Sequence, residues 1–103
     1  MKENIIQKKI KDKLTLAGWY VVVLHGSMYQ SGMPDLYCTH SRYGVRLVEV
    51  KRPDRKGDVF TPAQIDVFPK LCANGSNVWV LTGEGDSEIK KLFGPCNWYT
   101  FLF

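Results

Sequence analysis

Two acidic residues and a lysine stand at a spacing that can assemble a metal site at one end of a β-hairpin. Asp35 opens one strand-like run, and Glu49 and Lys51 close the next, with turn-forming residues 41–44 between them. Glu49 and Lys51 share a face because side chains alternate along a strand. Two carboxylates suit Mg²⁺ or Mn²⁺, and a nearby ammonium suits phosphate chemistry. The spacing therefore indicates divalent-metal binding and phosphate chemistry.

The register of this hairpin decides whether the two acids meet. A turn centred near residues 42–43 sets Asp35 roughly opposite Val50. Asp35 then joins the face of Glu49 only if the register differs by one residue or the strand end bends. Two plain readings stay open: Asp35 only terminates a turn, or Glu49 pairs with Lys51 on a solvated face.

The elements around the hairpin follow from apolar spacing and turn residues. Residues 3–17 carry a helical apolar stripe, and residues 19–24 and 78–81 are typical of strands. Thr61 is expected to cap a second helix that ends at Asn74-Gly75. Pro69 is expected to distort that helix because proline lacks the amide hydrogen. Asp86 or Ser87 is expected to cap a short helix through Phe93.

Size and composition indicate one domain over residues 1–103. The net charge of +4 and a hydrophobic content of 45% favour a folded domain with a polyanionic partner. Three widely spaced cysteines and the absence of a long apolar run or a secretory pattern predict no membrane association and a cytoplasmic location, which for a viral protein is the host's. The apolar tail from Asn97 to Phe103 either completes the core, the favoured reading, or serves self-association.

Three segments carry a resemblance to a known family. They are Gly32-Met33-Pro34-Asp35, Glu49-Val50-Lys51 and Thr61-Pro62-Ala63-Gln64. Together they resemble the PD-(D/E)XK nuclease superfamily and, more narrowly, its stand-alone VRR-NUC members, small proteins often encoded by bacterial viruses. The resemblance extends from about Glu3 to Leu81. It implies an α/β fold with a restriction-endonuclease-like αβββαβ core, in which helices flank a mixed central sheet.

The resemblance also implies roles for residues of the metal site. Asp35, Glu49 and the backbone carbonyl of Val50 would bind Mg²⁺ or Mn²⁺. Lys51 would orient the attacking water or stabilise the phosphate, and the sequence leaves both roles open. Glu3 would reach the metal through water or a second metal position, or would only complement a helix dipole.

Residues outside the acid pair are candidates for contacting water or substrate. Gln64 matches the downstream glutamine of the family and is expected to position water or a phosphate oxygen; the plain alternative is an exposed polar residue. Ser27 is a substrate-contact candidate, and His25 is a weaker one. Arg52 and Arg55 belong to a basic cluster beside the site and are phosphate-contact candidates.

These observations predict a metal-dependent, structure-specific endodeoxyribonuclease. A domain this small has little surface for reading bases and no evident recognition helix, which favours branched DNA over a sequence-specific target. The resemblance implies Holliday-junction-like substrates and a homodimer. The alternatives are a catalytically silent DNA-binding module on the same fold, and a nuclease that acts on DNA ends or RNA.

Overall fold

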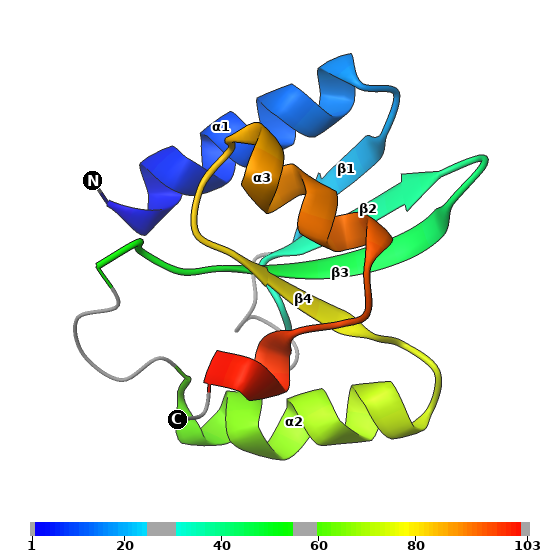
Figure 1. Cartoon of the computed structure of the whole chain (residues 1–103). Helices are drawn as coiled ribbons and strands as arrows, with labels where there is room; N and C mark the ends of the chain where they lie inside the picture. The colour runs from blue at the N-terminus through cyan, green and yellow to red at the C-terminus, as the bar shows by residue number, and fades with distance from the viewer. Residues whose placement is uncertain (1, 25–30, 55–59, 102–103) are drawn as a thin grey trace.

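The computed structural model describes residues 2–24, 31–54 and 60–101. The elements follow the chain in the order α1 (Glu3–Leu16), β1 (Tyr20–Val23), β2 (Leu36–His40), β3 (Gly44–Val50), α2 (Pro62–Ala73), β4 (Val78–Leu81), α3 (Asp86–Ile89) and the 3-10 helices η1 (Lys90–Phe93) and η2 (Trp98–Phe101) (Figure 1). The predicted order of elements is confirmed, with ends that differ by one or two residues.

The described strands form one mixed sheet in the order β1-β2-β3-β4. The first three strands pair antiparallel. Strand β4 pairs parallel to β3, because α2 crosses over between them and brings the chain back to the end of the sheet where β3 begins. The fold is therefore the predicted α/β arrangement, a mixed sheet flanked by helices.

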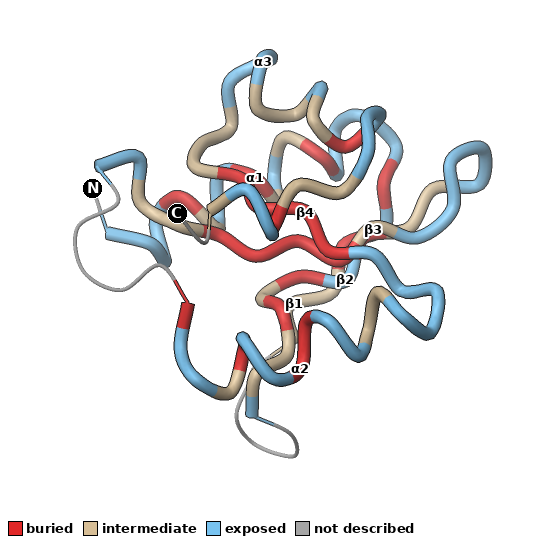
Figure 2. The backbone as a smooth tube through the Cα atoms, turned by 60° about the horizontal axis from the view of Figure 1, so that its bottom comes forward, coloured by how far each residue is buried: buried red, intermediate tan, exposed pale blue. Residues whose placement is uncertain are grey.

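Each face of the sheet packs against its own helices. Figure 1 shows α1 and α3 on one side of the sheet and α2 on the other. Ile6, Ile10 and Leu14 of α1 are buried against Val48 and Trp79 on the first face. The opposite face carries a second cluster of buried residues, formed by Leu47, Phe60, Phe68, Val78, Val80 and Trp98. The main-chain tube in Figure 2 is buried along most of β3 and all of β4, so these strands form the centre of the core.

The face that carries α2 is covered only in part. Helix α2 lies over β4 and the later part of β3, whereas Tyr20 of β1, Tyr37 of β2 and Val45 near the start of β3 remain exposed on this face. An exposed apolar surface of this kind on a small domain usually marks an interaction site.

Helix α2 runs without a break through Pro69. The prediction of Thr61 as N-cap and Pro62 as the first helical residue is confirmed, and Thr61 also forms a capping box with Gln64. Pro69 does not end the helix, which continues to Ala73 (Figure 1), and the distortion expected at Pro69 stays a prediction. Pro69 lacks the N–H group that would donate a hydrogen bond to the carbonyl of Ile65, which is an exposed residue.

The carboxyl-terminal segment completes the core as far as the structure describes it. Trp98 is buried, its ring meets Phe60 and Phe68 edge-on, and its indole N–H donates to Cys72 Sγ. Phe101 packs against the same cluster.

The short α3 starts with Gly85 at the N-cap position, so the predicted cap at Asp86 or Ser87 is wrong and Asp86 lies in the first turn.

Candidate active site

The register of the hairpin brings the two acids to the same face of the sheet. Leu36 pairs with Val48, so one further residue sets Asp35 opposite Glu49. The register predicted from a turn centred at residues 42–43 is therefore off by one residue, because three residues, 41–43, connect His40 to Gly44. This shift is one of the two conditions under which the acids meet. Asp35 Oδ2 also accepts a hydrogen bond of 2.7 Å from the Val50 N–H, which ties it to the end of β3.

Glu49 is a buried carboxylate with one oxygen engaged and one oxygen unpartnered. Its side chain is 4% exposed. Oε2 accepts from Gln64 Nε2 at 2.9 Å and lies 3.1 Å from Lys51 Nζ. Oε1 is buried and has no hydrogen-bond partner among the residues that the structure describes. The plain reading of a Glu49–Lys51 pair on a solvated face is therefore wrong, although the pair itself exists.

Lys51 is held at the end of β3 by its backbone and by its side chain. Its N–H donates to the Leu81 carbonyl at 3.0 Å and so extends the pairing of β3 with β4. Its Nζ lies 5.5 Å from the centroid of the Phe60 ring, within the range of a cation–π contact. The ammonium group therefore points to the α2 side of the sheet, where Glu49 lies.

Burial shifts the pKa of both acids upward. Desolvation raises the pKa of Glu49 to about 7, the charge of Asp35 adds to the rise, and Lys51 opposes it. Desolvation also raises the pKa of Asp35, against the Val50 N–H and Lys51, which lower it. Two carboxylates with raised pKa values beside each other are a site that a divalent cation would stabilise.

Glu3 lies near this pair without being part of its hydrogen bonds. It begins α1 and is exposed, and its negative charge contributes to the raised pKa of Asp35. Its predicted role toward the metal stays a prediction, and its position in the first turn of α1 also fits the helix-dipole reading.

Gln64 faces the acid pair from the first turn of α2. Its side chain is buried and donates to Glu49, so the alternative reading as an exposed polar residue is wrong. Arg52 follows Lys51 directly, and its Nε lies 3.5 Å from Asp54 Oδ1. Ser27, His25 and Arg55 lie outside the described residues.

The donor set fits a hard divalent cation, but the side chains do not form a full cage. Within residues 2–24, 31–54 and 60–101, no group of three or more His, Cys, Asp or Glu side chains could hold a metal ion. Asp35 and Glu49 offer carboxylate oxygens, and the buried unpartnered Oε1 of Glu49 is the atom that a cation would satisfy. A pair of carboxylates with water in the remaining positions is how Mg²⁺ is commonly bound.

Two contributors to the site were missed by sequence reasoning. Phe60 places its ring under the Lys51 ammonium, and Gly32 lies against the Ala63 carbonyl in the first turn of α2. Gly32 stands in the motif that carries the family resemblance, which was a signal for a backbone constraint. Phe60 precedes the helix cap and gave no signal of its own.

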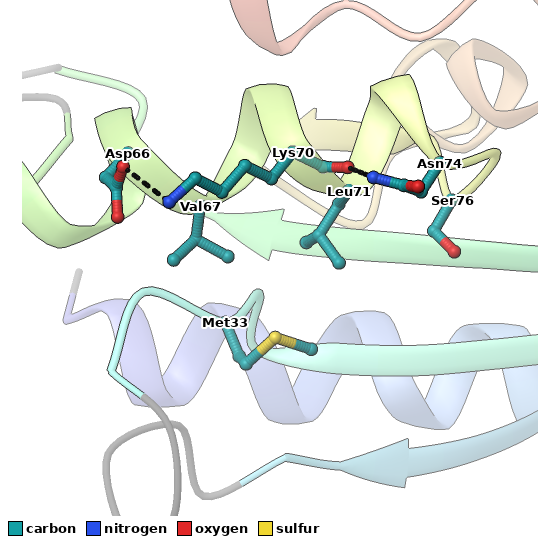
Figure 3. Close-up of a pocket in the computed structure, with 7 residues that line it drawn as sticks. All are labelled: Met33, Asp66, Val67, Lys70, Leu71, Asn74 and Ser76. Atoms are coloured by element: carbon teal, nitrogen blue, oxygen red, sulfur yellow. Dashed lines mark hydrogen bonds and ion pairs between the residues drawn. The ribbon is translucent and has the colours of Figure 1, made fainter.

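The segment that precedes Asp35 touches α2 at Gly32 and Ala63, and farther along the helix the two move apart. A cavity of about 390 Å³ lies between Met33 and the side of α2, where it meets Val67 and Leu71 (Figure 3). Asp66 and Lys70 form an ion pair of 3.1 Å at its rim. The acids of the site do not line this cavity, so it is separate from the candidate metal position.

The fold and the site define a class of protein. A mixed sheet between helices, with its acids at the end of the central hairpin, is a nuclease-like α/β domain. The family model described as "VRR-NUC domain" matches residues 2–85. The chain therefore belongs to the VRR-NUC family, as predicted, and is a nuclease-type domain.

A solved structure agrees with this assignment. A chain described as "VRR_NUC domain" is 29% identical in sequence and superimposes with a TM-score of 0.68, covering 88% of this chain and 92% of its own length. No curated protein matches the chain. In the part of the chain that the structure describes, no helix has the length and apolar character needed to cross a membrane.

Proposed function

We propose that this protein is a Mg²⁺- or Mn²⁺-dependent endodeoxyribonuclease that hydrolyses phosphodiester bonds. The observation that carries the proposal is Glu49 Oε1, a buried carboxylate oxygen without a partner that lies on the face shared with Asp35. Burying such an oxygen costs free energy unless a ligand satisfies it. Membership of the VRR-NUC family supports a nuclease as the class of enzyme.

The residues present fit the implied cation. Asp35, Glu49 and the carbonyl of Val50 would hold it, and Glu3 would contribute through water. When bound, the cation would polarise the phosphate and lower the pKa of a water molecule. The chain's own contribution is to bury the carboxylates, to orient Glu49 through Gln64, and to hold both groups against the sheet.

Lys51 supplies the positive charge of the reaction. Its ammonium lies beside Glu49 and is 13% exposed, so it reaches the site but is largely shielded from water. In that environment a fixed positive charge stabilises the charge that develops on phosphate oxygens more strongly than it would in bulk water. Lys51 either acts in this way or orients the attacking water.

The proposed substrate is branched DNA of the Holliday-junction type, cut by a homodimer. Symmetric cutting of two strands needs two related active sites. The exposed surface of Tyr20, Tyr37 and Val45 on the α2 face supports a contact between two copies. Arg52, together with Ser27 and Arg55, would contact phosphates. The free thiols of the three cysteines support a reducing location such as the cytoplasm.

The competing functions share the fold and differ in chemistry. A DNA-binding module without activity has no reason to keep two buried carboxylates, because they repel phosphate. A nuclease directed to DNA ends or RNA would use the same site, and only the choice of substrate separates it from the proposed enzyme.

A cleavage assay tests the proposal. Wild-type protein and Glu49→Gln are incubated with a four-way junction, a flap, linear duplex DNA and single-stranded RNA, in Mg²⁺, Mn²⁺ or EDTA. The proposal expects metal-dependent internal cuts in the junction by wild type alone. Folded wild-type protein that cuts none of the four substrates in either metal is not a nuclease of this kind.

A further inference from the structure

We infer that the start of α2 is a positioning element for the site: Phe60, Thr61 and Gln64, with Gly32 packed against Ala63, fix the arrangement of Asp35, Glu49 and Lys51. This inference rests on the proposed function for its catalytic consequence. The positioning itself is a property of the metal-free protein. Three independent contacts support it, one for each residue of the site.

The first contact is made by the two ends of the Gln64 amide. Its Oε1 accepts from the Thr61 N–H at 3.0 Å, and Thr61 Oγ1 accepts from the Gln64 N–H at 3.1 Å. This capping box fixes the direction of the side chain, because an amide has one accepting end and one donating end. Nε2 is left to donate to Glu49 Oε2 at 2.9 Å. The helix cap thereby selects which Glu49 oxygen is engaged and leaves Oε1 open.

The second contact is made by Phe60 and fixes Lys51. The ring is buried and meets Phe68 at 5.5 Å and Trp98 at 6.2 Å, in both cases nearly edge-on. A ring held on two sides gives Lys51 Nζ a fixed surface at 5.5 Å. The ammonium group is therefore placed by the residue that immediately precedes the helix cap.

The third contact is made by Gly32 and fixes the segment that leads to Asp35. Gly32 has φ of +89°, and a Cβ atom there would lie 2.5 Å from the Ala63 carbonyl oxygen. Such a distance requires the loop or the helix to shift, because the neighbouring atom belongs to the backbone. The same Cβ atom would lie 2.8 Å from Val67 Cγ2, and beyond Val67 the side of α2 and Met33 line the cavity in Figure 3.

A pair of glycine variants tests the inference. Gly75 has φ of +93° and open space around its Cβ position. Gly32→Ala and Gly75→Ala therefore introduce similar backbone strain, and only Gly32→Ala displaces the first turn of α2. Gln64→Met tests the same element through its contact with Glu49, because it keeps the length of the side chain and removes its hydrogen bonds. Asn74→Ala is the control, because it removes a side-chain hydrogen bond at the far end of α2.

The metal-free readout is the Val50 amide resonance in a ¹H–¹⁵N spectrum. Its proton donates to Asp35 Oδ2 at 2.7 Å, so it reports the position of that carboxylate. We expect this resonance to move in Gly32→Ala and to stay in Gly75→Ala. A Val50 resonance that is unchanged in folded Gly32→Ala overturns the role of Gly32, whether or not the protein cuts DNA.

The catalytic readout is turnover at saturating Mn²⁺ on the substrate that wild type cuts. A displacement near 1 Å in a positioned site costs about 100-fold. We expect kcat to fall by at least about tenfold in Gly32→Ala and Gln64→Met, with KM nearly unchanged, and to stay within about twofold in the two controls. Equal losses in variants and controls overturn the inference. If Gly32→Ala does not fold, Gln64→Met and Asn74→Ala decide the question. If wild type cuts nothing, the proposed function fails and the Val50 resonance alone decides this inference.

Discussion

Lys51 Nζ lies 3.1 Å from Glu49 Oε2 in a pair whose side chains are 13% and 4% exposed. Despite this positive neighbour, burial and the charge of Asp35 raise the pKa of Glu49 to about 7. Lysine alone is therefore insufficient to keep the carboxylate fully ionised at neutral pH. The site has capacity for further positive charge, which is the physical basis of the predictions that follow.

Stability of the metal-free protein is expected to fall as the pH rises from about 4.5 to about 7. The pKa of Glu49 is 4.5 in the unfolded chain and about 7 in the folded protein, so the folded state holds the proton more tightly. The stabilisation is complete below pH 4.5 and is lost by about pH 7. The shift corresponds to roughly 3 kcal/mol. Urea unfolding in EDTA between pH 4.5 and 8 measures it, and Glu49→Gln should make the profile shallower, leaving the contribution of Asp35, whose pKa burial also raises. An equal slope in wild type and Glu49→Gln would remove Glu49 as the cause.

Mn²⁺ is expected to stabilise the folded protein. A ligand that binds only the folded state at 100 times its Kd contributes about 2.7 kcal/mol, and in a domain of this size that raises Tm by roughly 11–22 °C. Differential scanning fluorimetry with and without Mn²⁺ measures the shift at pH 7.5. Glu49→Gln and Asp35→Asn should show little of it. A shift of equal size in both variants would locate the ion elsewhere.

Much of the fold follows from local patterns in the sequence, and the register does not. Both helices were predicted because their signals lie within a few residues of each other. These signals are the apolar stripe of Ile6, Ile10 and Leu14 and the N-cap residue Thr61. The register depends on whether the hairpin turn holds two or three residues, and Arg42 and Tyr43 permit either. The Arg42 N–H donates to His40 Nδ1 at 3.0 Å, a contact visible only in the folded turn.

The charged residues of the site were predictable from the sequence, whereas the residues that hold them in position were not. Asp35, Glu49 and Lys51 are recognisable from residue type and spacing. The burial of Glu49, by contrast, comes from α2, which is distant in sequence. The contacts of Phe60 and Gly32 likewise join segments that only the tertiary structure brings together. From sequence alone, the Glu49–Lys51 pair at the end of β3 is therefore compatible with a solvated face. Only the packing of α2 against this end of the strand shows that Glu49 is buried.

Lys51→Met is expected to separate metal binding from turnover. Methionine keeps an apolar stem against Phe60 and removes the ammonium group. The Mn²⁺-induced Tm shift should remain, because the carboxylates are intact. Single-turnover cleavage should slow by about 100-fold, a typical loss for one electrostatic contact to the transition state. Full-rate cleavage by this variant would exclude Lys51 from the chemistry.

Arg52→Ala is expected to weaken DNA binding without changing the cleavage rate of bound DNA. One lost phosphate contact should lower the slope of log K against log salt by about 1. Fluorescence anisotropy in Ca²⁺ or without metal, over a range of salt concentrations, measures this slope. Lys8→Ala, on the exposed side of α1, is a matched loss of one charge at a distance from the site. Identical slopes for the two variants would show that Arg52 has no specific contact.

Pro69→Ala is expected to stabilise the protein and leave activity unchanged. Alanine restores an amide donor to the Ile65 carbonyl inside α2, and the helix is already formed around this position. The gain should be about 1–3 kcal/mol, given the cost of proline in a helix interior. Thermal unfolding measures it. A lower Tm for Pro69→Ala would mean that the proline ring contributes packing that outweighs the missing hydrogen bond.

The central claim is that a divalent cation binds between Asp35 and Glu49. The most direct measurement is the anomalous difference density of a crystal soaked in Mn²⁺. The account predicts a peak about 2 Å from Glu49 Oε1 and from a carboxylate oxygen of Asp35. A well-ordered site with both acids in place and no peak between them, at Mn²⁺ concentrations that support any cleavage, would contradict it.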